Sequence, residues 1–280
     1  MIGNILKMQT TLNDQKGDKK KNDTVQYALP IGEGLLAMNE HIGKTIKLSY
    51  KNEIHCISCG RKTNKSFAQG HCYPCFRRLA SCDMCIMKPE TCHFAEGTCR
   101  EPEWGKANCF ISHYVYLANS SGIKVGITRG TQIPTRWMDQ GAAQALPVFQ
   151  VATRLQSGLL EVALKEFVSD RTDWRKMLKS DAEPQDLKVV RDELLDKCSS
   201  KIEDIKKEQG AGDIKIIDEK VVEIKYPITE YPEKIKSLNF DKQSEIEGRL
   251  MGIKGQYLIL DSGVLNIRKF TGYNIEVDFV

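Results

Sequence analysis

The sequence predicts an α+β protein, in which a cysteine-knuckle module is followed by a small α/β domain, a helical segment and a C-terminal antiparallel β-barrel. Three observations predict this order. Nine of the ten cysteines lie between residues 56 and 109. The stretch after them alternates strand-like and helix-like patterns, and the stretch after residue 210 holds regularly spaced strands with glycine turns.

The composition is that of a folded protein outside membranes. Hydrophobic residues make up 41% of the 280-residue chain, which is enough for a packed core. No run approaches the ~18–20 apolar residues of a membrane helix. The N-terminus, MIGNILKMQTTLNDQKGDKKKND, has no apolar stretch ahead of a small-residue cleavage site. These features exclude membrane, collagen-like and fully disordered proteins, and we expect a cytoplasmic protein.

The net charge of +4 is unevenly distributed. Lys and Arg exceed Asp and Glu by 8 over residues 1–160 and fall short of them by 4 over the remainder. A basic excess at one end of the chain favours an anionic partner.

The sequence patterns divide the chain into six segments. They are a mobile tail (1–23), N-terminal strands (24–54), a double metal module (55–112), a small α/β domain (113–172), helices (173–210) and a C-terminal β domain (211–280). The lysine-rich part of the tail, KGDKKKND, could touch nucleic acid, although a solvated tail is the simpler interpretation. We expect the N-terminal strands to join the C-terminal barrel.

Five elements are expected in the small α/β domain. In order they are a strand (HYVYLAN, 113–119), a strand (IKVGIT, 123–128), a short helix (TRWMDQGA, 135–142), a strand (LPVFQVATR, 146–154) and a helix (SGLLEVALKEFV, 157–168). The first two strands are joined by a short SSG turn and therefore form a hairpin. Ser157 is the expected N-cap of the last helix.

Two helices are expected next, over 173–182 and 185–208. The longer one has a single apolar stripe formed by Leu187, Val190, Leu194, Cys198, Ile202 and Ile205. Cys198 lies on this stripe and is therefore expected in the core, and Gly210 is expected to end the helix.

Two CxxC pairs predict the first metal site. Cys56 and Cys59 are separated by twelve residues from Cys72 and Cys75, and Gly60 provides a sharp turn after the first pair. Two such turns supply four soft ligands with tetrahedral geometry, which is typical of zinc. His55 and His71 are interpreted as bystanders, because four thiolates already complete the site.

A second, less regular cluster predicts a second zinc ion. The expected ligands are Cys82, Cys85, Cys92 and Cys99, and the alternates are Cys109, His93 and His113. An iron–sulfur cluster would also require four cysteines, but nothing nearby in the sequence indicates an electron partner. Both sites are expected to be structural, because a four-thiolate site has no open position for water and this segment has few large aliphatic residues.

The hairpin segment resembles the GIY-YIG nuclease family. The resemblance rests on Tyr114-Val115-Tyr116, on Lys124-Val125-Gly126 with Thr128, on Arg136 and on Glu161. Members of that family place two signature strands in a hairpin, an Arg on the first helix and a Glu on the second. The element order expected above agrees with that fold.

The resemblance implies a catalytic set. Tyr116, or Tyr114 in its place, would help to deprotonate the attacking water, and Arg136 would lower the tyrosine pKa and stabilise the phosphate charge. Glu161 would hold one Mg²⁺ or Mn²⁺ ion. The sequence departs from the family pattern where Lys124 replaces the tyrosine of the second motif and Tyr114 the glycine of the first. Lys124 cannot serve as a phenol but could bind phosphate.

Simpler roles remain open for the same residues. Tyr116 could pack in the core, Arg136 could pair with Asp139 at i+3, and Glu161 could favour the first turn of its helix through the helix dipole.

Nearly all of residues 28–280 also resembles an uncharacterised prokaryotic family, domain-of-unknown-function family 2797. The phrases that carry this resemblance are KSFAQGHCYPC, GTCREPEWG, VYLANSSGIKVGITR, PTRWMDQGA and GIKGQYLILDSGVLNIRK. That family implies no known activity.

Three functions remain open. The first is a zinc-binding, metal-dependent phosphodiesterase acting on DNA or RNA. The second is a non-catalytic, zinc-stabilised nucleic-acid-binding module that stacks bases on exposed aromatic residues. The third is RNA modification by a cysteine left over from the metal sites, such as Cys92 or Cys109.

Overall fold

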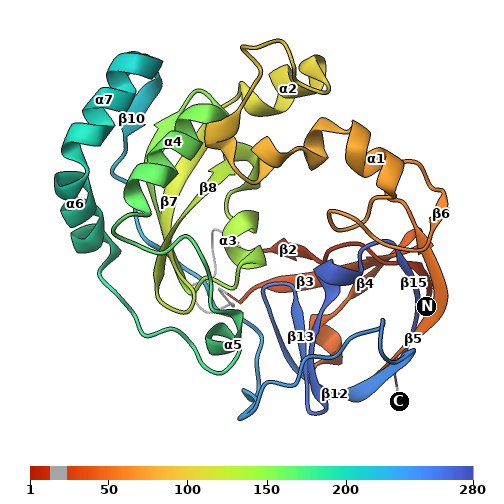
Figure 1. Ribbon diagram of the computed structural model, residues 1–280. Coiled ribbons are helices and arrows are strands. Elements are labelled where there is room, and N and C mark those ends of the chain that lie inside the picture. The colour runs from red at the N-terminus through yellow and green to blue at the C-terminus, as the bar shows by residue number, and fades with distance from the viewer. Residues whose placement is uncertain (13–23, 280) are drawn as a thin grey trace.

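The computed structural model describes residues 1–12 and 24–279 (Figure 1). Its named strands form three antiparallel sheets, which are linked by helices and by a long cysteine-rich segment. No helix within the described ranges is long and apolar enough to cross a membrane.

The largest sheet joins the two ends of the chain. Its order is β1, β15, β5, β12, β13, β14, with β6 beside β5. The strands are β1 (Ile2–Asn4), β5 (Thr45–His55), β6 (Lys62–Thr63), β12 (Glu245–Lys254), β13 (Tyr257–Leu260), β14 (Gly263–Asn266) and β15 (Tyr273–Phe279). The N-terminal strand β5 pairs with both β12 and β15, so the expected joining of the two ends is confirmed. The path from β1 to β14 does not close among the described strands, so the predicted barrel is not confirmed.

A three-stranded sheet, β2 (Gln9–Thr11), β3 (Gln26–Ile31) and β4 (Gly34–Ala37), lies beside it. The predicted mobile tail is wrong for residues 1–12, because β1 pairs with β15 and β2 pairs with β3. Ile5 and Met8 between them are 1% and 0% exposed. Three-residue strands leave no periodicity in the sequence, and their partners lie far along the chain. The lysine-rich part of the predicted tail lies outside the described residues.

The third sheet contains the predicted hairpin. It consists of β7 (His113–Asn119), β8 (Ile123–Arg129), β9 (Gln144–Val151), β10 (Ile214–Ile216) and β11 (Val222–Glu223), in the order β10, β9, β7, β8, with β11 also on β9. With the helices α3 (Thr135–Asp139) and α4 (Arg154–Leu164), the expected order of strand, strand, helix, strand, helix is confirmed. The short strands β10 and β11 belong to this sheet rather than to the C-terminal β domain in which the sequence placed them.

Successive residues of β7 enter two different cores, as the alternation of a strand requires. Val115 and Leu117 pack with Leu160 of α4. Tyr116 on the other face belongs to the core shared with Trp137 of α3 and with the large sheet. The hairpin sheet is therefore buried on both faces, with α4 on one and α3 on the other.

The helix α4 begins earlier than expected. Thr153 is its N-cap, and its side-chain oxygen accepts a hydrogen bond from the Gln156 N–H at 3.2 Å. The Gln156 side chain accepts the Thr153 N–H in return at 2.9 Å, which completes a capping box. The predicted cap, Ser157, lies inside the helix and donates to the Arg154 carbonyl.

The helical segment is divided into α5 (Trp174–Met177), α6 (Leu187–Lys197) and α7 (Ser199–Gln209). The predicted long helix is interrupted at Cys198, whose ψ of 3° departs from helical geometry. Its apolar stripe from Val190 to Ile205 still packs in one core, and Cys198 is buried as expected. Gly210, with φ 95°, ends α7 as predicted.

The cysteine-rich segment runs from β6 to β7, coloured orange to yellow in Figure 1. It contains α1 (Tyr73–Arg78), α2 (Pro102–Cys109) and the 3-10 turns η2 (Ala80–Cys82), η3 (Met84–Ile86) and η4 (Pro89–Thr91). Its turn η4 packs directly on α4, where a Cβ on Gly158 would lie 2.6 Å from the Cβ of Pro89. This close approach fixes the segment to the helix that carries Glu161.

Candidate functional site

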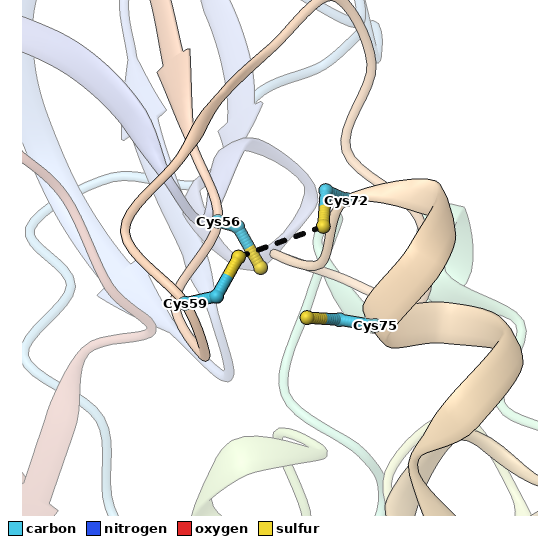
Figure 2. A group of neighbouring side chains, drawn as sticks. All are labelled: Cys56, Cys59, Cys72 and Cys75. Atoms are coloured by element: carbon cyan, nitrogen blue, oxygen red, sulfur yellow. Dashed lines mark hydrogen bonds between the residues drawn. The ribbon is translucent and has the colours of Figure 1, made fainter.

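Four cysteines at the end of β5 and the start of α1 form the first candidate metal centre. The Sγ atoms of Cys56, Cys59, Cys72 and Cys75 all lie within 4.8 Å of one another. Those of Cys59 and Cys72 are 3.7 Å apart (Figure 2). A tetrahedral zinc ion with Zn–S bonds of ~2.3 Å holds its sulfurs about 3.8 Å apart. The predicted ligands are therefore together at a spacing suited to zinc.

Local chain geometry explains how these ligands meet. Cys56 directly follows β5, and Gly60 adopts φ 70°, a left-handed conformation that lets the chain turn back into β6. Cys72 precedes the first residue of α1 and Cys75 lies in its first turn. Four protein ligands leave no open position for a substrate, so this centre is suited to a structural role.

The thiols of this centre have unequal acidity. Burial raises the pKa of Cys56, but backbone N–H groups, the first of them that of Cys72, more than offset this and lower it to about 6. Burial raises the pKa of Cys75 to about 11, and the neighbouring thiols reinforce the shift. A divalent cation would hold all four as thiolates, so metal binding would release protons. Arg61 beside Cys59 offsets part of the resulting negative charge.

Four of the five other clustered cysteines, Cys85, Cys92, Cys99 and Cys109, line a cavity of about 20 Å³. The predicted ligand Cys82 is not in this lining, and the alternate Cys109 takes its place. Between η2 and η3 lies Asp83 in an extended conformation (φ −70°, ψ 157°), so the chain does not make the tight knuckle that the CxxC spacing suggested. Burial raises the pKa of Cys82, which disfavours a reactive thiolate there.

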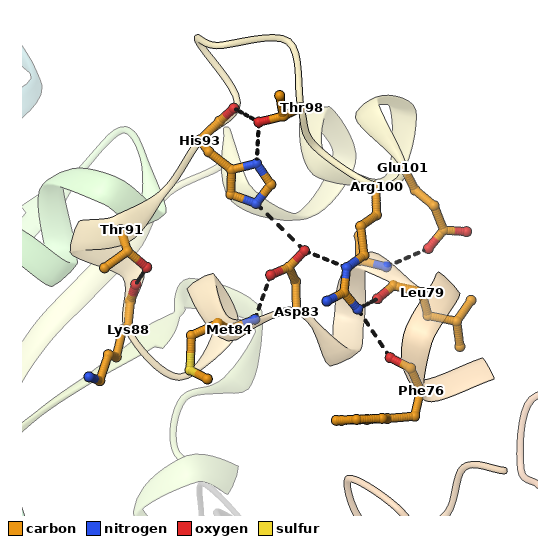
Figure 3. A network of polar contacts seen from close by, with 11 residues as sticks. Phe76, Leu79, Asp83, Met84, Lys88, Thr91, His93, Thr98, Arg100 and Glu101 are labelled. Atoms are coloured by element: carbon orange, nitrogen blue, oxygen red, sulfur yellow. Dashed lines mark hydrogen bonds and ion pairs between the residues drawn. The ribbon is translucent and has the colours of Figure 1, made fainter. Parts of the chain in front are cut away.

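A second group of potential ligands, Asp83, Cys85 and His93, is also part of the lining of this cavity. The Asp83 carboxylate is 2.6 Å from Nε of Arg100 and 3.5 Å from Nε2 of His93 (Figure 3). His93 also bonds to Thr98 through Nδ1 at 2.7 Å. Because the Arg100 guanidinium already neutralises Asp83, this group forms an ion-paired network rather than a cation site. His93 is part of that network.

His113, the other alternate ligand, is the first residue of β7 and is fully buried. Burial lowers its pKa to about 4, so the ring is neutral. Its Nδ1 lies 2.7 Å from the Ile111 carbonyl oxygen, and its Nε2 has no hydrogen-bond partner among the described residues. His113 does not line the cysteine cavity.

The β7–β8 register places the predicted catalytic residues on one face of the hairpin. Tyr116 lies opposite Gly126, and Lys124 lies opposite Ala118. The Tyr116 ring crosses over Gly126, where an added Cβ would lie 2.7 Å from the Tyr116 Oη. A glycine is therefore required at this position of the second strand.

The hydroxyl of Tyr116 lies in the protein interior. It donates to Oε1 of Gln140 at 2.9 Å, and the ring packs edge-on against Trp137 with centroids 5.9 Å apart. Burial raises the pKa of Tyr116, while the positive charge of Arg136 opposes the shift. Tyr116 is 0% exposed, so its expected role as a base towards water is not supported by its environment.

The charged residues of the predicted set lie within electrostatic range of one another. Burial raises the pKa of Glu161 to about 7, the charge of Asp170 adds to this, and Arg136 opposes it. Burial lowers the pKa of Lys124 to about 8; Arg136 adds to the shift, while Glu161 and Asp170 oppose it. We refer to Tyr116, Lys124, Arg136, Glu161 and Asp170 as the polar cluster. Strongly shifted pKa values in a group of this kind are typical of functional sites.

The simpler roles for Arg136 and Glu161 are wrong. Asp139 does not pair with Arg136; it pairs with Lys7 at 2.7 Å and accepts a hydrogen bond from Gln256 at 2.9 Å. Glu161 lies well beyond the first turn of α4, which begins at Arg154. The helix dipole therefore does not explain its position.

Sequence reasoning missed Asp170, Gln140 and Arg154. Asp170 reaches the hairpin because the Ser169 carbonyl accepts the Val125 N–H at 2.8 Å, a contact with no local signal in the sequence. Gln140 follows α3 directly and could have been found from its position one turn beyond Arg136. Arg154 is the first residue of α4, and the charge of Arg136 contributes to lowering its pKa.

Tyr114 is set apart from the polar cluster. It lines a cavity of about 840 Å³ together with Thr135, Trp137 and residues of the N-terminal sheet. Tyr116, Arg136 and Glu161 do not line this cavity. Tyr114 is therefore a weaker substitute for Tyr116 than the sequence suggested.

Comparison with known proteins identifies a family but no activity. No curated protein and no solved structure matches the chain. The resemblance to GIY-YIG nucleases therefore remains a prediction that rests on the hairpin residues. The family described as "protein of unknown function (DUF2797)" matches residues 43–275, which include both cysteine clusters and the polar cluster. The chain belongs to this family.

Proposed function

We propose that this protein binds nucleic acid at the polar cluster and cleaves phosphodiester bonds there with the help of a divalent metal ion. The observation that carries the proposal is that Arg136 of α3 and Glu161 of α4 both act electrostatically on Tyr116 of β7. Their mutual electrostatic influence is what a GIY-YIG-like arrangement requires. Fold resemblance alone would not carry it, because one fold hosts many functions.

The cations of the site favour a phosphate ligand. Lys124 and Arg154 both have pKa values lowered by burial, and the charge of Arg136 lowers each of them further. Arg136 repels both of these cations, and a bound phosphate would relieve that repulsion. Phosphate contacts of this kind supply much of the affinity of nucleic-acid-binding proteins.

The carboxylates of the site would hold the metal ion. Glu161 has a pKa of about 7 because it is buried and lies near Asp170. A hard divalent cation would favour the ionised form of both side chains, and Mg²⁺ or Mn²⁺ prefers such oxygen ligands. The ion would neutralise charge on the scissile phosphate and activate water.

Tyr116 and Arg136 would have separate tasks. Tyr116 donates to Gln140 and is shielded from solvent, so it would orient the groups around it rather than accept a proton. The guanidinium of Arg136 would stabilise the negative charge that develops on the phosphate.

A non-catalytic nucleic-acid-binding module is the second candidate, and a surface of the first metal centre favours it. Tyr73 is 54% exposed, and its ring lies 5.5 Å from that of Phe67. The Lys65 ammonium lies 5.3 Å from the Phe67 centroid. Arg61, Arg77 and Arg78 of the same cysteine-rich segment are also exposed. Aromatic faces beside cations are the usual means of binding single strands.

A nuclease assay run beside a binding assay tests the proposal. Labelled single- and double-stranded DNA and RNA are incubated with Mg²⁺, Mn²⁺ or a chelator, and binding is measured by fluorescence anisotropy. Glu161→Gln is expected to reduce metal-dependent cleavage by at least about 100-fold. Binding should stay within a few fold, because the substitution removes a negative charge. Arg136→Ala should weaken both.

Glu193→Gln is the matched control, because Glu193 is an exposed helical residue paired only with Lys197 in the described structure. It should leave cleavage and binding unchanged. Binding that needs no metal, shows no cleavage and is lost in Tyr73→Ala would support the second candidate instead. Absence of binding to every nucleic acid would contradict both.

A further inference from the structure

We infer that the cavity lined by Tyr114 is a pocket for one base of the bound nucleic acid, and that it favours a base with an exocyclic amino group. This inference rests on the proposed function, because the base would belong to a strand whose phosphate lies at the polar cluster. It adds a site that selects the base beside the site that carries the chemistry.

The cavity has the size and the walls of a ligand pocket. Its volume of about 840 Å³ lies within the range of pockets that enclose small molecules. Residues of β2, α3, β7 and β11 line it, so it lies where the N-terminal sheet and the hairpin sheet meet at α3. The helix α3 contacts β2 directly (Figure 1). The walls are mainly apolar and include Tyr114, Pro134 and Met138.

Tyr114 provides a flat wall against which a base can stack. Its ring is held close to Gly130, where an added Cβ would lie 3.0 Å from Cε2 of Tyr114. The Gly130 N–H in turn donates to the Ser112 carbonyl at 3.0 Å, which fixes the glycine. The Tyr114 side chain is nevertheless partly exposed. A positioned and accessible aromatic ring is the usual stacking partner of an unpaired base.

Two residues of the lining carry polar atoms that lack a partner. These atoms are Oγ1 of Thr10 and Nε1 of Trp137, and neither forms a hydrogen bond within the described residues. The two residues are only 6% and 1% exposed. Buried polar side-chain atoms in native proteins are almost always hydrogen-bonded, to water or to a ligand where the protein offers no partner. This observation is independent of the cavity volume and indicates a ligand with hydrogen-bonding atoms.

The charges of the lining favour a neutral ligand that donates hydrogen bonds. They belong to Glu219, Lys220 and Glu223, which are all exposed and form no ion pair with another described residue. Two carboxylates against one ammonium leave a net negative charge, which repels a phosphate. A carboxylate accepts hydrogen bonds from the amino group of cytosine, adenine or guanine. Uracil and thymine have no amino group, so the lining should discriminate against them.

The position of the cavity suits a base next to the polar cluster. Tyr114 and Tyr116 lie on the same face of β7, two residues or about 7 Å apart along the strand. On α3, Thr135 and Trp137 line the cavity, and Arg136 lies between them in the sequence. A nucleotide whose phosphate binds at Arg136 therefore has its base within reach of Tyr114. The cations of the polar cluster would hold the phosphate, and the carboxylates of the cavity would hold the base.

Binding of free nucleosides tests the pocket directly. Guanosine, adenosine, cytidine and uridine are titrated into the full chain, and binding is measured by calorimetry and by saturation-transfer NMR. We expect the three amino-bearing nucleosides to bind at least about fivefold more tightly than uridine. Short oligomers of A, C and U, followed by fluorescence anisotropy, should show the same preference.

Variants of the lining identify the contacts. Tyr114→Ala should weaken nucleoside binding about 10-fold, whereas Tyr114→Phe keeps the ring and should bind almost as the wild type does. The double variant Glu219→Gln/Glu223→Gln should lose the preference over uridine. Both of these residues are exposed, so the variant should fold normally even if Tyr114→Ala does not. Glu193→Gln is the matched control and should keep the preference.

The outcomes separate this inference from the proposed function. Cleavage that depends on Glu161, in a protein that binds no nucleoside and shows no base preference, would overturn the pocket and leave the proposed function intact. Nucleoside binding that Tyr114→Ala weakens, in a protein that neither binds nor cleaves oligonucleotides, would support the pocket and contradict the proposed function. Equal binding of all four nucleosides, or a preference that survives in the double variant, would overturn the assigned base chemistry.

Discussion

Gly126 is the residue of the hairpin that can least accept a side chain. A Cβ there would lie 2.7 Å from both Cζ and Oη of Tyr116. Both residues are in the interior of the sheet, where close packing leaves little freedom to move. The glycine therefore sets the position of the tyrosine and, through it, of the polar cluster.

We expect Gly126→Ala to lower the free energy of unfolding by about 1–3 kcal/mol, the usual cost of overpacking a core. Urea unfolding followed by circular dichroism measures it. Gly212→Ala is the control, because nothing lies within 4 Å of its Cβ position. Adding Tyr116→Phe should recover part of the loss, since it removes one of the two clashing atoms. A Gly126→Ala protein as stable as the control would show that Tyr116 is free to move.

The sequence predicts those site residues whose positions follow from the order of neighbouring strands and helices along the chain. Tyr116, Lys124, Arg136 and Glu161 follow one another through a hairpin and two helices, so one motif pattern finds them all. Asp170 could not be found this way, because it depends on a backbone contact between distant segments. The exchange of Cys82 for Cys109 has the same cause, since CxxC spacing reports a local turn and the cavity is formed by tertiary packing.

Among the elements, α4 connects the candidate sites. Its first residue, Arg154, donates to the carbonyl of Ile86 in the lining of the cysteine cavity, Gly158 allows contact with η4, and Glu161 contributes to the polar cluster. The sequence predicted this helix from its apolar face but not its start. The signal was present, because Thr153 and Gln156 have the T-x-x-Q spacing of a capping box, but Thr153 was assigned to the preceding strand.

The N-cap of α4 is Thr153 in the structure, whereas the sequence predicted Ser157, and the stability of two variants distinguishes these positions. Thr153→Ala should destabilise the protein by about 1 kcal/mol, because it leaves the Gln156 N–H without its partner. Ser157→Ala should cost less, because the Ser157 hydroxyl only donates to a carbonyl within the same helix. Thermal and urea unfolding of the two variants compare them directly. A larger loss in Ser157→Ala would favour the later start.

At the scale of the whole molecule, the two ends of the chain complete one sheet. β1 pairs with β15 from Ile2 opposite Glu276 onward, and the Ile5 N–H donates to the Tyr273 carbonyl at 2.9 Å. The first twelve residues lie outside the matched family region, which begins at residue 43. Ile5 and Met8 among them nevertheless belong to the main core, although strands this short leave no periodic signal in the sequence.

Ile5 and Leu6 test this role, because they are adjacent and differ in burial. Ile5 is 1% exposed within the main core, whereas Leu6 is 40% exposed. Ile5→Ala should lower the free energy of unfolding by about 2–5 kcal/mol, which combines lost burial with a cavity. Leu6→Ala should cost under about 1 kcal/mol. Urea unfolding of both variants at one pH compares their free energies of unfolding. If the N-terminus were a mobile tail, neither substitution would change the free energy of unfolding. If it is packed in the core, Ile5→Ala must cost clearly more than Leu6→Ala.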